Sequence, residues 1–487
     1  MSISSALSNA LSGLNVSSRA ADVVSSNIAN AMTDGYGVRE LDIASRVIGN
    51  SGAGARVVGV TRHEDPVLAS QRRQADAALA QITTQSDFLT RMESLIGTPD
   101  QPGSLTARVA DFEAALVAAS NAPQSHAYLS SAVSAAESLV TQIDNISGGI
   151  QDERFQADQQ IARHVERLNT TLDQLSELNV QILRGRGGTT DVSSLLDAQA
   201  RLVDSIAPLV PIQTRRDQHG ALQIYSLDGY ALLDGRPAEF GFDAAPSIND
   251  QMRVEDGNLS GLTLNGHAVS MTGPQALLKG GSIASLFHLR DEAAVTAQDQ
   301  IDTVAFDLVT RFQDPALDPT RLPGDPGLFT DSGLPAASAT QRGLASRLSV
   351  NAAVVPAEGG AVWRLRDGLG AVTEGPVGQS SLLHAQMEAL TASLPTAGTA
   401  FLGVSRSFSG LVSEHLSLTG ISRQTADTDR AHRAAHHEIL RQEELAQGVD
   451  TDDELQRLLQ IEQAYAANAR VITAAEEMLD ELMRIAG

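Results

Sequence analysis

The sequence predicts a mainly α-helical protein with an inserted β domain, in which helices from the two ends of the chain form a coiled coil. Three observations lead to this fold class. Apolar residues recur every three to four positions at both ends of the chain, and long internal stretches repeat that spacing. One internal stretch instead alternates short apolar runs with Asp-Gly and Asn-Gly turns, which is typical of strands. At 487 residues the chain is long enough for about three domains.

The first thirty residues predict an opening helix with one apolar stripe. Apolar side chains alternate spacings of four and three there, which places them on one face. The helix should end near Ala31, because Asn30, Asp34 and Gly35 favour a turn. The stripe consists of Ile3, Leu7, Leu14, Val24 and Ile28, with the smaller Ala10, Ser17 and Ala21 between them.

The last forty residues predict a closing helix of the same kind. Gly448 can end the preceding helix, and Thr451 and Glu454 have the spacing of a capping box. The closing stripe consists of Leu458, Ile461, Tyr465, Asn468, Ile472, Ala475, Leu479, Leu482 and Ala486.

The two stripes are expected to pair and to serve as an assembly interface. Asn468 and Ser17 fall on stripe positions, where a buried polar group can fix the register of a coiled coil at a cost in stability. Residues 1–45 and 446–487 are therefore expected to form a coiled-coil inner domain. A stripe of this kind is also what the core face of an ordinary folded helix looks like.

The middle of the chain is expected to contain two further domains. Residues 46–207 and 274–445 have helical spacing and should form a helical domain, interrupted by a Pro-rich excursion at 313–375. Residues 208–273 should form a small outer β domain that can be removed without unfolding the helices. A short strand is expected around Trp363.

The composition excludes several classes of partner. The formal net charge is −24 and Lys279 is the only lysine, so nucleic acid is not an expected partner. No apolar run approaches the roughly 18 to 20 residues of a membrane helix, so no membrane insertion is expected. The chain has no cysteine, which excludes thiol chemistry. The first basic residue is Arg19, so the N-terminus does not read as a cleaved signal peptide.

No catalytic, cofactor or metal site is expected. His432 and His436 are four residues apart and could share a metal, but a polar helix face is the better interpretation. The zinc-hydrolase pattern needs a second histidine four residues after the first, and after His437-Glu438 that position is Arg441. The rival interpretation from another class is a secreted hydrolase with helical additions.

A segment at the end of the opening helix carries a family resemblance. Residues 26–36, SNIANAMTDGY, resemble the N-terminal signature of flagellar rod, hook and hook-associated proteins, in which an NIAN helix end runs into a TPGY turn. Asp34 stands where the family has proline, so the fixed φ of proline is lost. The matching residues are Asn27, Asn30, Thr33, Gly35 and Tyr36, with Arg39 just beyond.

Further matching motifs lie later in the chain. Residues 464–472, AYAANARVI, look like the C-terminal AYxANARVI of the same family and include Ala469 and Arg470. The segment 448–454 is similar to the GVNxDEE of hook-associated members. Residues 194–203 partly match their LLDxRDxL, with Gln199 and Ala200 at the Arg-Asp positions, so any salt bridge between those two positions is absent.

The resemblance implies a structural adaptor of the bacterial flagellum at the hook–filament junction, assembling through its terminal helices. Its implied partners are the flagellar hook protein, a second junction protein adjoining the filament, further copies of itself and a flagellar export chaperone. It also implies type III export, without a cleaved signal peptide, to an extracellular position. The alternative within the family is a hook or rod protein; those would follow the N-terminal motif with β-rich sequence, whereas helices are expected here.

Overall fold

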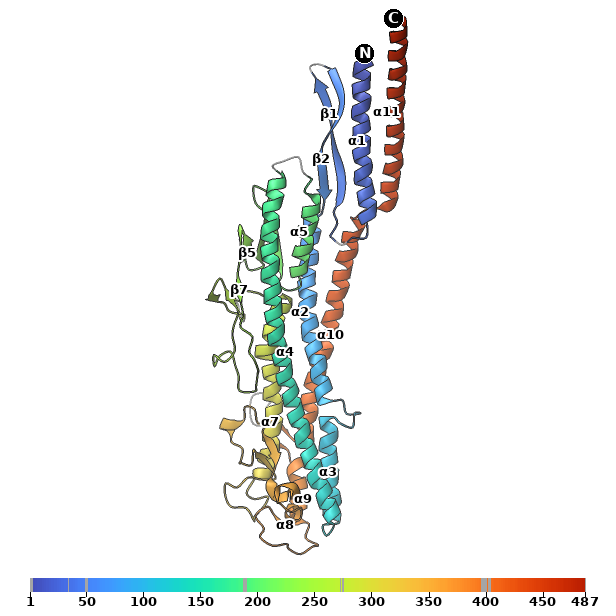
Figure 1. Cartoon of the computed structure of the whole chain (residues 1–487). Helices are drawn as coiled ribbons and strands as arrows, with labels where there is room; N and C mark the ends of the chain where they lie inside the picture. The colour runs from blue at the N-terminus through green and yellow to red at the C-terminus, as the bar shows by residue number, and fades with distance from the viewer. Residues whose placement is uncertain are drawn as a thin grey trace.

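The computed structural model shows an elongated molecule whose long helices run along one axis, with both termini at the same end (Figure 1). It confirms the predicted fold class, a mainly α protein with long terminal helices and an inserted β region. The residues that the structure describes are 3–33, 35–48, 51–186, 191–271, 273, 276–395, 401 and 404–486.

Four elements form what we call the terminal arm. They are α1 (Ile3–Asn30), the antiparallel hairpin of β1 (Val38–Ile48) and β2 (Ser51–His63), and α11 (Thr451–Ala486). Helix α1 lies between the hairpin and α11 (Figure 1). It ends at Asn30, as predicted.

The hairpin corrects one expectation, namely that helices follow directly after Arg39. The boundary expected at residue 45 falls inside β1. The hairpin sequence is rich in valine and isoleucine, which favour strands, and its length exceeds the usual strand of five to six residues. This long hairpin belongs with α1 rather than with the helices that follow.

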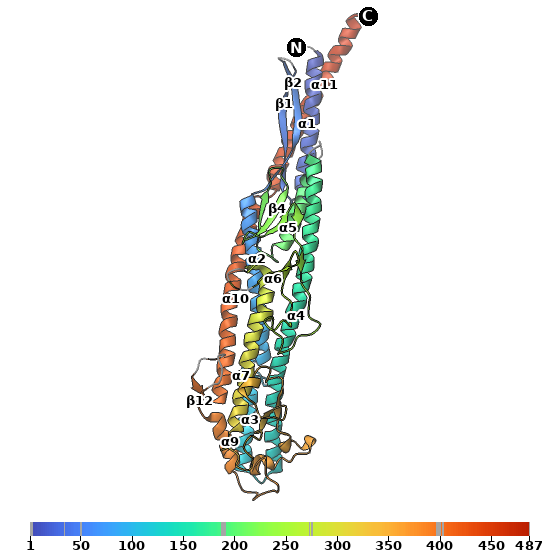
Figure 2. The same cartoon turned by 90° about the vertical axis from the view of Figure 1, so that its left-hand side faces the viewer.

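Below the arm, long helices pack around one continuous core (Figure 2). The first of them begins with Pro66 at its first position, and the Asp65 carboxylate accepts hydrogen bonds from the Val67 and Leu68 amides. The helices are α2 (Pro66–Ile96), α3 (Leu105–Asn121), α4 (His126–Arg186), α5 (Ser193–Ile206), α6 (Gly281–His288), the π-helical η1 (Leu289–Ala293), α7 (Ala294–Gln313) and α10 (Phe408–Ala446).

The inserted strands lie along α4 (Figure 1). A four-stranded antiparallel sheet has the order β3-β4-β5-β6, and a three-stranded one has the order β7-β8-β9. The strands are β3 (Ile212–Arg216), β4 (Leu222–Ser226), β5 (Ala231–Asp234), β6 (Arg236–Pro237), β7 (Phe240–Gly241), β8 (Thr263–Leu264) and β9 (His267–Ala268).

These strands share the core of the helices. Ile224, Leu232 and Leu233 are fully buried in the same apolar cluster as α4. The buried guanidinium of Arg154 on α4 donates to the Met252 carbonyl at 2.6 Å. The strands thus cover the helical core, so we expect removal of residues 208–273 to unfold the helices rather than leave them intact.

The Pro-rich excursion contains only short elements. They are β10 (Phe329–Asp331), η2 (Ser338–Thr340), β11 (Leu348–Val350), η3 (Ala352–Val354), η4 (Pro356–Glu358) and α8 (Arg364–Asp367). After it come α9 (Ser381–Thr391), β12 (Leu394–Pro395) and β13 (Ser405–Arg406). The strand expected around Trp363 is absent: the Arg364 amide donates to the Ala361 carbonyl at 3.0 Å, so Trp363 lies in a turn that leads into α8.

The connection from α10 to α11 is short. Helix α10 ends at Ala446 and α11 begins at Thr451, as predicted. The Asp450 carboxylate accepts from the amides of Asp452 and Asp453 at 2.9 and 3.3 Å, so Asp450 caps the helix instead of Thr451.

Candidate assembly surface and its joint

Helices α1 and α11 lie side by side and contact each other through small and polar side chains. Ala10, Ser17 and Val24 of α1 are buried, as is Ala475 of α11. At Gly13 an added methyl group would lie 2.6 Å from the side-chain nitrogen of Asn468. The absence of a side chain at Gly13 therefore lets α11 approach α1 closely at the polar stripe position.

The predicted stripe residues differ in how far one chain covers them. Ile3, Leu7, Leu14 and Ile28 are half-buried on α1, as are Leu458, Ile461, Asn468 and Ile472 on α11. Tyr465, Leu479 and Leu482 remain 44%, 42% and 52% exposed. Of the C-terminal motif residues, Ala469 is half-buried and Arg470 is exposed. A single chain thus covers the stripe of α1 better than that of α11.

Helix α11 exposes further apolar side chains on its other faces. Met483 and Ile485 are 76% and 75% exposed. Leu455, Leu459, Val471 and Met478 of α11 are exposed too, and the hairpin separately exposes Ile43, Val47 and Val58. Extended apolar surface of this kind marks protein–protein interfaces. The terminal arm therefore has the character of an assembly surface.

The N-terminal motif is not part of this exposed surface, because the side chain of its Asn27 is fully buried. The Asn27 side-chain nitrogen donates to the Arg39 carbonyl at 2.9 Å. Its side-chain oxygen accepts from the Tyr36 hydroxyl at 2.9 Å and from the Arg39 amide at 3.1 Å. Asn27 thus ties the end of α1 to the start of β1, with its hydrogen-bonding groups satisfied inside the chain.

The rest of the motif shapes the turn between α1 and β1. The Asn30 side chain donates to the Ser26 carbonyl at 2.9 Å and accepts from the Thr33 hydroxyl at 3.3 Å. Gly35 has φ of 75°, which glycine adopts without strain. The Arg39 guanidinium lies 4.8 Å from the centre of the Tyr36 ring, a cation–π contact. The Asp34 position falls outside the described residues.

One carboxylate connects this motif to the helices below. Asp197 of α5 is buried and accepts from the Gly37 amide at 3.1 Å, from Arg39 Nη2 at 2.8 Å and from Arg62 Nε at 2.7 Å. Arg62 also donates to the Gly35 carbonyl at 3.3 Å and pairs with Glu64. We call Asp197, Arg39 and Arg62 the joint. The sequence singled out the Leu-Leu-Asp segment but predicted no role for its carboxylate.

A second ion cluster lies just below the joint. Asp204 of α5 accepts from Arg72 Nη2 at 2.6 Å and from Arg73 Nε at 2.7 Å. Arg72 also pairs with Asp76 at 2.7 Å and with Glu444 of α10 at 2.5 Å. This cluster ties α5, α2 and α10 together inside the helical part of the molecule.

The histidines considered as metal ligands separate in the structure. His437 lies 2.7 Å from the Asp76 carboxylate, so it bridges α10 to α2 and does not lie on a solvated face. His432 and His436 are exposed. The part of the chain that the structure describes contains no group of three or more His, Asp or Glu that could hold a metal ion.

Gln199, which follows the Leu-Leu-Asp segment, connects three elements of the helical part. Gln199 is buried and donates to the Asn179 side-chain oxygen at 2.9 Å. Asn179 in turn donates to the Leu222 carbonyl at 2.9 Å. Neutral amides thus connect α5, α4 and β4 at this place.

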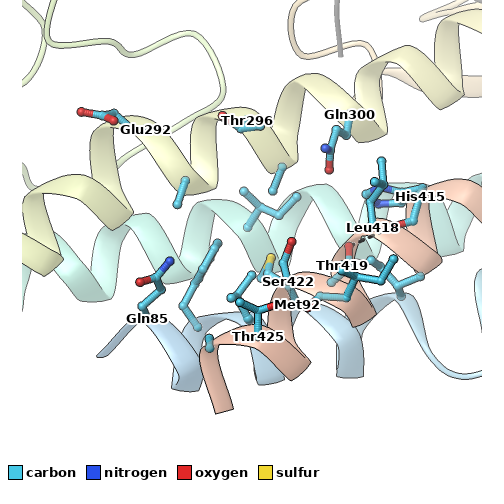
Figure 3. Close-up of a pocket in the computed structure, with 18 of the residues that line it drawn as sticks. Gln85, Met92, Glu292, Thr296, Gln300, His415, Leu418, Thr419, Ser422 and Thr425 are labelled. Atoms are coloured by element: carbon cyan, nitrogen blue, oxygen red, sulfur yellow. Dashed lines mark hydrogen bonds between the residues drawn. The ribbon is translucent and has the colours of Figure 1, made fainter. Parts of the chain in front are cut away.

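A groove of about 520 Å³ lies between α10 and the η1–α7 pair, with α2 and α4 as its floor. Thr296 and Gln300 face Leu418 and Ser422 across it, and His415 lies at one end (Figure 3). Among the described residues, neither ring nitrogen of His415 has a hydrogen-bond partner. Burial lowers the pKa of His415 to about 4, so the ring is neutral at neutral pH. No pattern in the sequence indicates this groove.

Among the helices of the described residues, none is long and apolar enough to cross a membrane.

Comparison with known proteins gives three family matches along the chain. Residues 89–328 match the flagellar hook-associated protein FlgK helical domain. Residues 7–36 match the flagella basal body rod protein family, and residues 446–485 match the C-terminal family of the basal body rod proteins FlgE, FlgF and FlgG. The two end matches cover most of α1 and α11, which form the apolar arm.

Individual relatives agree with these matches. Flagellar hook-associated protein 1 of Escherichia coli is 26% identical over 298 residues, which are 60% of this chain and 53% of that protein. The Bacillus subtilis protein of the same name is 22% identical over 519 aligned positions, covering 98% of this chain and 97% of that one. A solved structure, the flagellar hook junction protein FlgK from Burkholderia pseudomallei, aligns with a TM-score of 0.44 and 20% identity over 54% of this chain and 46% of that one. The chain thus spans about half the length of the Escherichia coli relative in its match.

The arm built from both chain ends and the family matches on it define a structural protein of the bacterial flagellar axis. Within that class, the chain is similar to the flagellar hook-associated protein FlgK, whose helical domain matches residues 89–328.

Proposed function

We propose that the protein is a non-catalytic adaptor subunit at the hook–filament junction of the bacterial flagellum. The observation that carries this proposal is the apolar surface of α11, on a helix pair whose two members both match flagellar axial families. Of the described side chains of α11, only Glu454 and Ala475 are buried, so this helix would gain most of its stabilisation from neighbouring subunits.

The assembly interface that we propose has two parts. On α1 it comprises Ile3, Leu7, Leu14, Val24 and Ile28, of which Val24 is buried and the others are half-buried in the single chain. On α11 it comprises Leu458, Ile461, Tyr465, Asn468, Ile472, Leu479 and Leu482, of which Tyr465, Leu479 and Leu482 are the most exposed. The proposed inner domain includes the hairpin, so its N-terminal part extends to residue 63.

The partners follow from the family. We propose that the arm contacts the hook protein on one side, a second junction protein toward the filament on the other, and further copies of the same chain around the tube. A flagellar export chaperone and type III export without a cleaved signal peptide belong to the same proposal. Names of relatives that refer to the hook and its junction support it.

Cosedimentation with purified hooks tests the proposal. Purified protein should bind to isolated hooks at their distal ends and should not bind to isolated filaments that lack a junction. Binding along the whole hook, or to rods alone, would favour a hook or rod protein. Absence of binding to any flagellar substructure would contradict the proposal.

A further inference from the structure

The backbone crosses between the terminal arm and the helical part of the molecule at two places. The first follows β2, at Glu64 and Asp65, and the second is the segment from Gln447 to Asp450 between α10 and α11. Neither crossing is part of a helix or strand. If these two crossings were the only connections, the arm could rotate relative to the helical part, as rigid elements do about a hinge.

The joint lies beside the first crossing and connects the two parts without covalent bonds. The Asp197 carboxylate belongs to α5, and all three of its donors belong to the arm: Gly37, Arg39 and Arg62. Helix α5 packs directly against β2 at this place. One side chain of the helical part is thus held by both strands of the hairpin.

The hydrogen bonds at Asp197 depend on how the arm is oriented relative to α5. Oδ1 accepts from the Gly37 amide and Arg62 Nε, and Oδ2 accepts from Arg39 Nη2. The side chains of Asp197, Arg62 and Arg39 are only 4%, 9% and 15% exposed. Charge-assisted hydrogen bonds with little solvent are strong and depend on orientation. A swing of the arm would separate buried opposite charges, which is costly.

The N-terminal motif supports the joint from the other side. Asn27 holds the Arg39 backbone through two hydrogen bonds, and the Tyr36 ring lies against the Arg39 guanidinium. Because Asn27 is fully buried within one chain, it has no surface to offer to a second copy.

We propose that the joint locks the direction of the terminal arm relative to the helical domain, and that the N-terminal family motif serves this lock within one chain instead of forming contacts between subunits. Asp197 is then a positioning residue: it fixes the angle at which the apolar faces of α1 and α11 are presented. Spin-label distances within one chain test the lock independently of the proposed place in the flagellum. Binding to hooks, by contrast, rests on that proposed function.

Spin-label distances test the lock directly, because the chain has no native cysteine. Labels at Ser18 of α1 and Asp173 of α4, both exposed, report the direction of the arm. A second pair, Asp173 and Gln442 of α10, reports the helical domain alone. In Asp197→Asn we expect a shifted or broadened distribution for the first pair and an unchanged one for the second.

The matched control is Asp204→Asn. It removes a carboxylate from the same helix that also binds two arginines, but those arginines belong to α2. We expect it to lower thermal stability without changing the distance from Ser18 to Asp173. Equal distance distributions in Asp197→Asn and Asp204→Asn would overturn the proposal, even if both variants melt earlier than the wild type.

A second variant keeps the test decisive if Asp197→Asn does not fold. Arg39→Gln removes one of the two arginines and leaves Asp197 paired with Arg62. We expect a smaller shift of the Ser18–Asp173 distance and reduced binding to hooks. An unchanged Ser18–Asp173 distance in Arg39→Gln, together with normal binding to hooks, would overturn the proposed lock. If the distance changes in the variant but even the wild type does not bind hooks, only the proposed function is refuted.

Discussion

Replacing Leu479 and Leu482 together by aspartate separates an assembly surface from an ordinary folded core. The two leucines are 42% and 52% exposed in the single chain, so about half of each remains to be buried. Full burial of a leucine side chain is worth about 1.5–3 kcal/mol, so the pair should contribute about 1.5–3 kcal/mol on assembly. Their loss alone weakens each subunit contact about tenfold to a hundredfold. Burying the new carboxylates adds a further penalty.

In the free subunit the same substitutions should change stability little, because surface substitutions usually alter the free energy of unfolding by less than about 0.5 kcal/mol. The assay compares thermal unfolding of the double variant with its binding to purified hooks. The control variant, Gln456→Asp with Gln460→Asp, adds the same charge at exposed polar positions of α11 and removes no apolar surface. A large drop in melting temperature with hook binding retained would refute the interpretation of α11 as an assembly element.

Three further predictions follow from burial. Because the folded-state pKa of His415, about 4, lies below the unfolded value of 6.5, the unfolded state binds a proton first as pH falls. The free energy of unfolding should therefore fall by roughly 3 kcal/mol between pH 6.5 and pH 4, and this group should not affect it above pH 6.5. Chemical denaturation of His415→Leu should show a shallower dependence of that free energy on pH. Equal pH dependence in the wild type and the variant would contradict the assignment of a neutral, buried His415. Deleting residues 212–268 should uncover the core around Ile224 and Leu233 and abolish cooperative unfolding, which calorimetry detects; a deletion variant as stable as the full chain would show that the strands are dispensable. In a verified monomer, residues from about 450 to 487 should exchange their amide hydrogens fast, because few of the described side chains there are buried. Strong protection throughout Leu458 to Leu482 would count against that prediction.

The terminal helices could be predicted because their signal is local. Apolar spacing along α1 and α11 identifies both helices, and the turn residues after Asn30 and Gly448 mark their boundaries closely. The mainly α fold follows from the same periodicity in α2 and α4. What periodicity did not reveal is which face of α11 one chain covers, since that depends on where α1 lies.

The hairpin and the joint could not be predicted for two different reasons. The strands of the hairpin expose apolar residues such as Val47 and Val58, so they lack the regular alternation of a half-buried strand. The joint brings Asp197 to Arg39 and Arg62 across 158 and 135 residues of sequence. No pattern within a short stretch of sequence indicates a pairing between residues so far apart along the chain. A carboxylate in an apolar stretch such as that of α5 does indicate that a partner exists, because a buried charge needs one.

The packing of the β segment against the helices could not be predicted, because its boundaries look like those of an insertion. Turn signals bracket residues 208–273, and these commonly delimit a removable domain. The side chains of Leu232 and Leu233 instead extend the helical core, and buried groups such as Arg154 need the loop carbonyls as hydrogen-bond partners. Sharing of a core between segments is a property of tertiary packing and leaves no mark in local composition.

The most direct test of the proposed place in the flagellum is immunogold electron microscopy of intact flagella with an antibody against this protein. If the protein is the junction adaptor, gold particles should lie at one narrow band where the hook meets the filament, and cells that lack the protein should carry hooks without filaments. Label distributed along the hook or at the basal rod, or normal filaments on cells that lack the protein, would contradict the account.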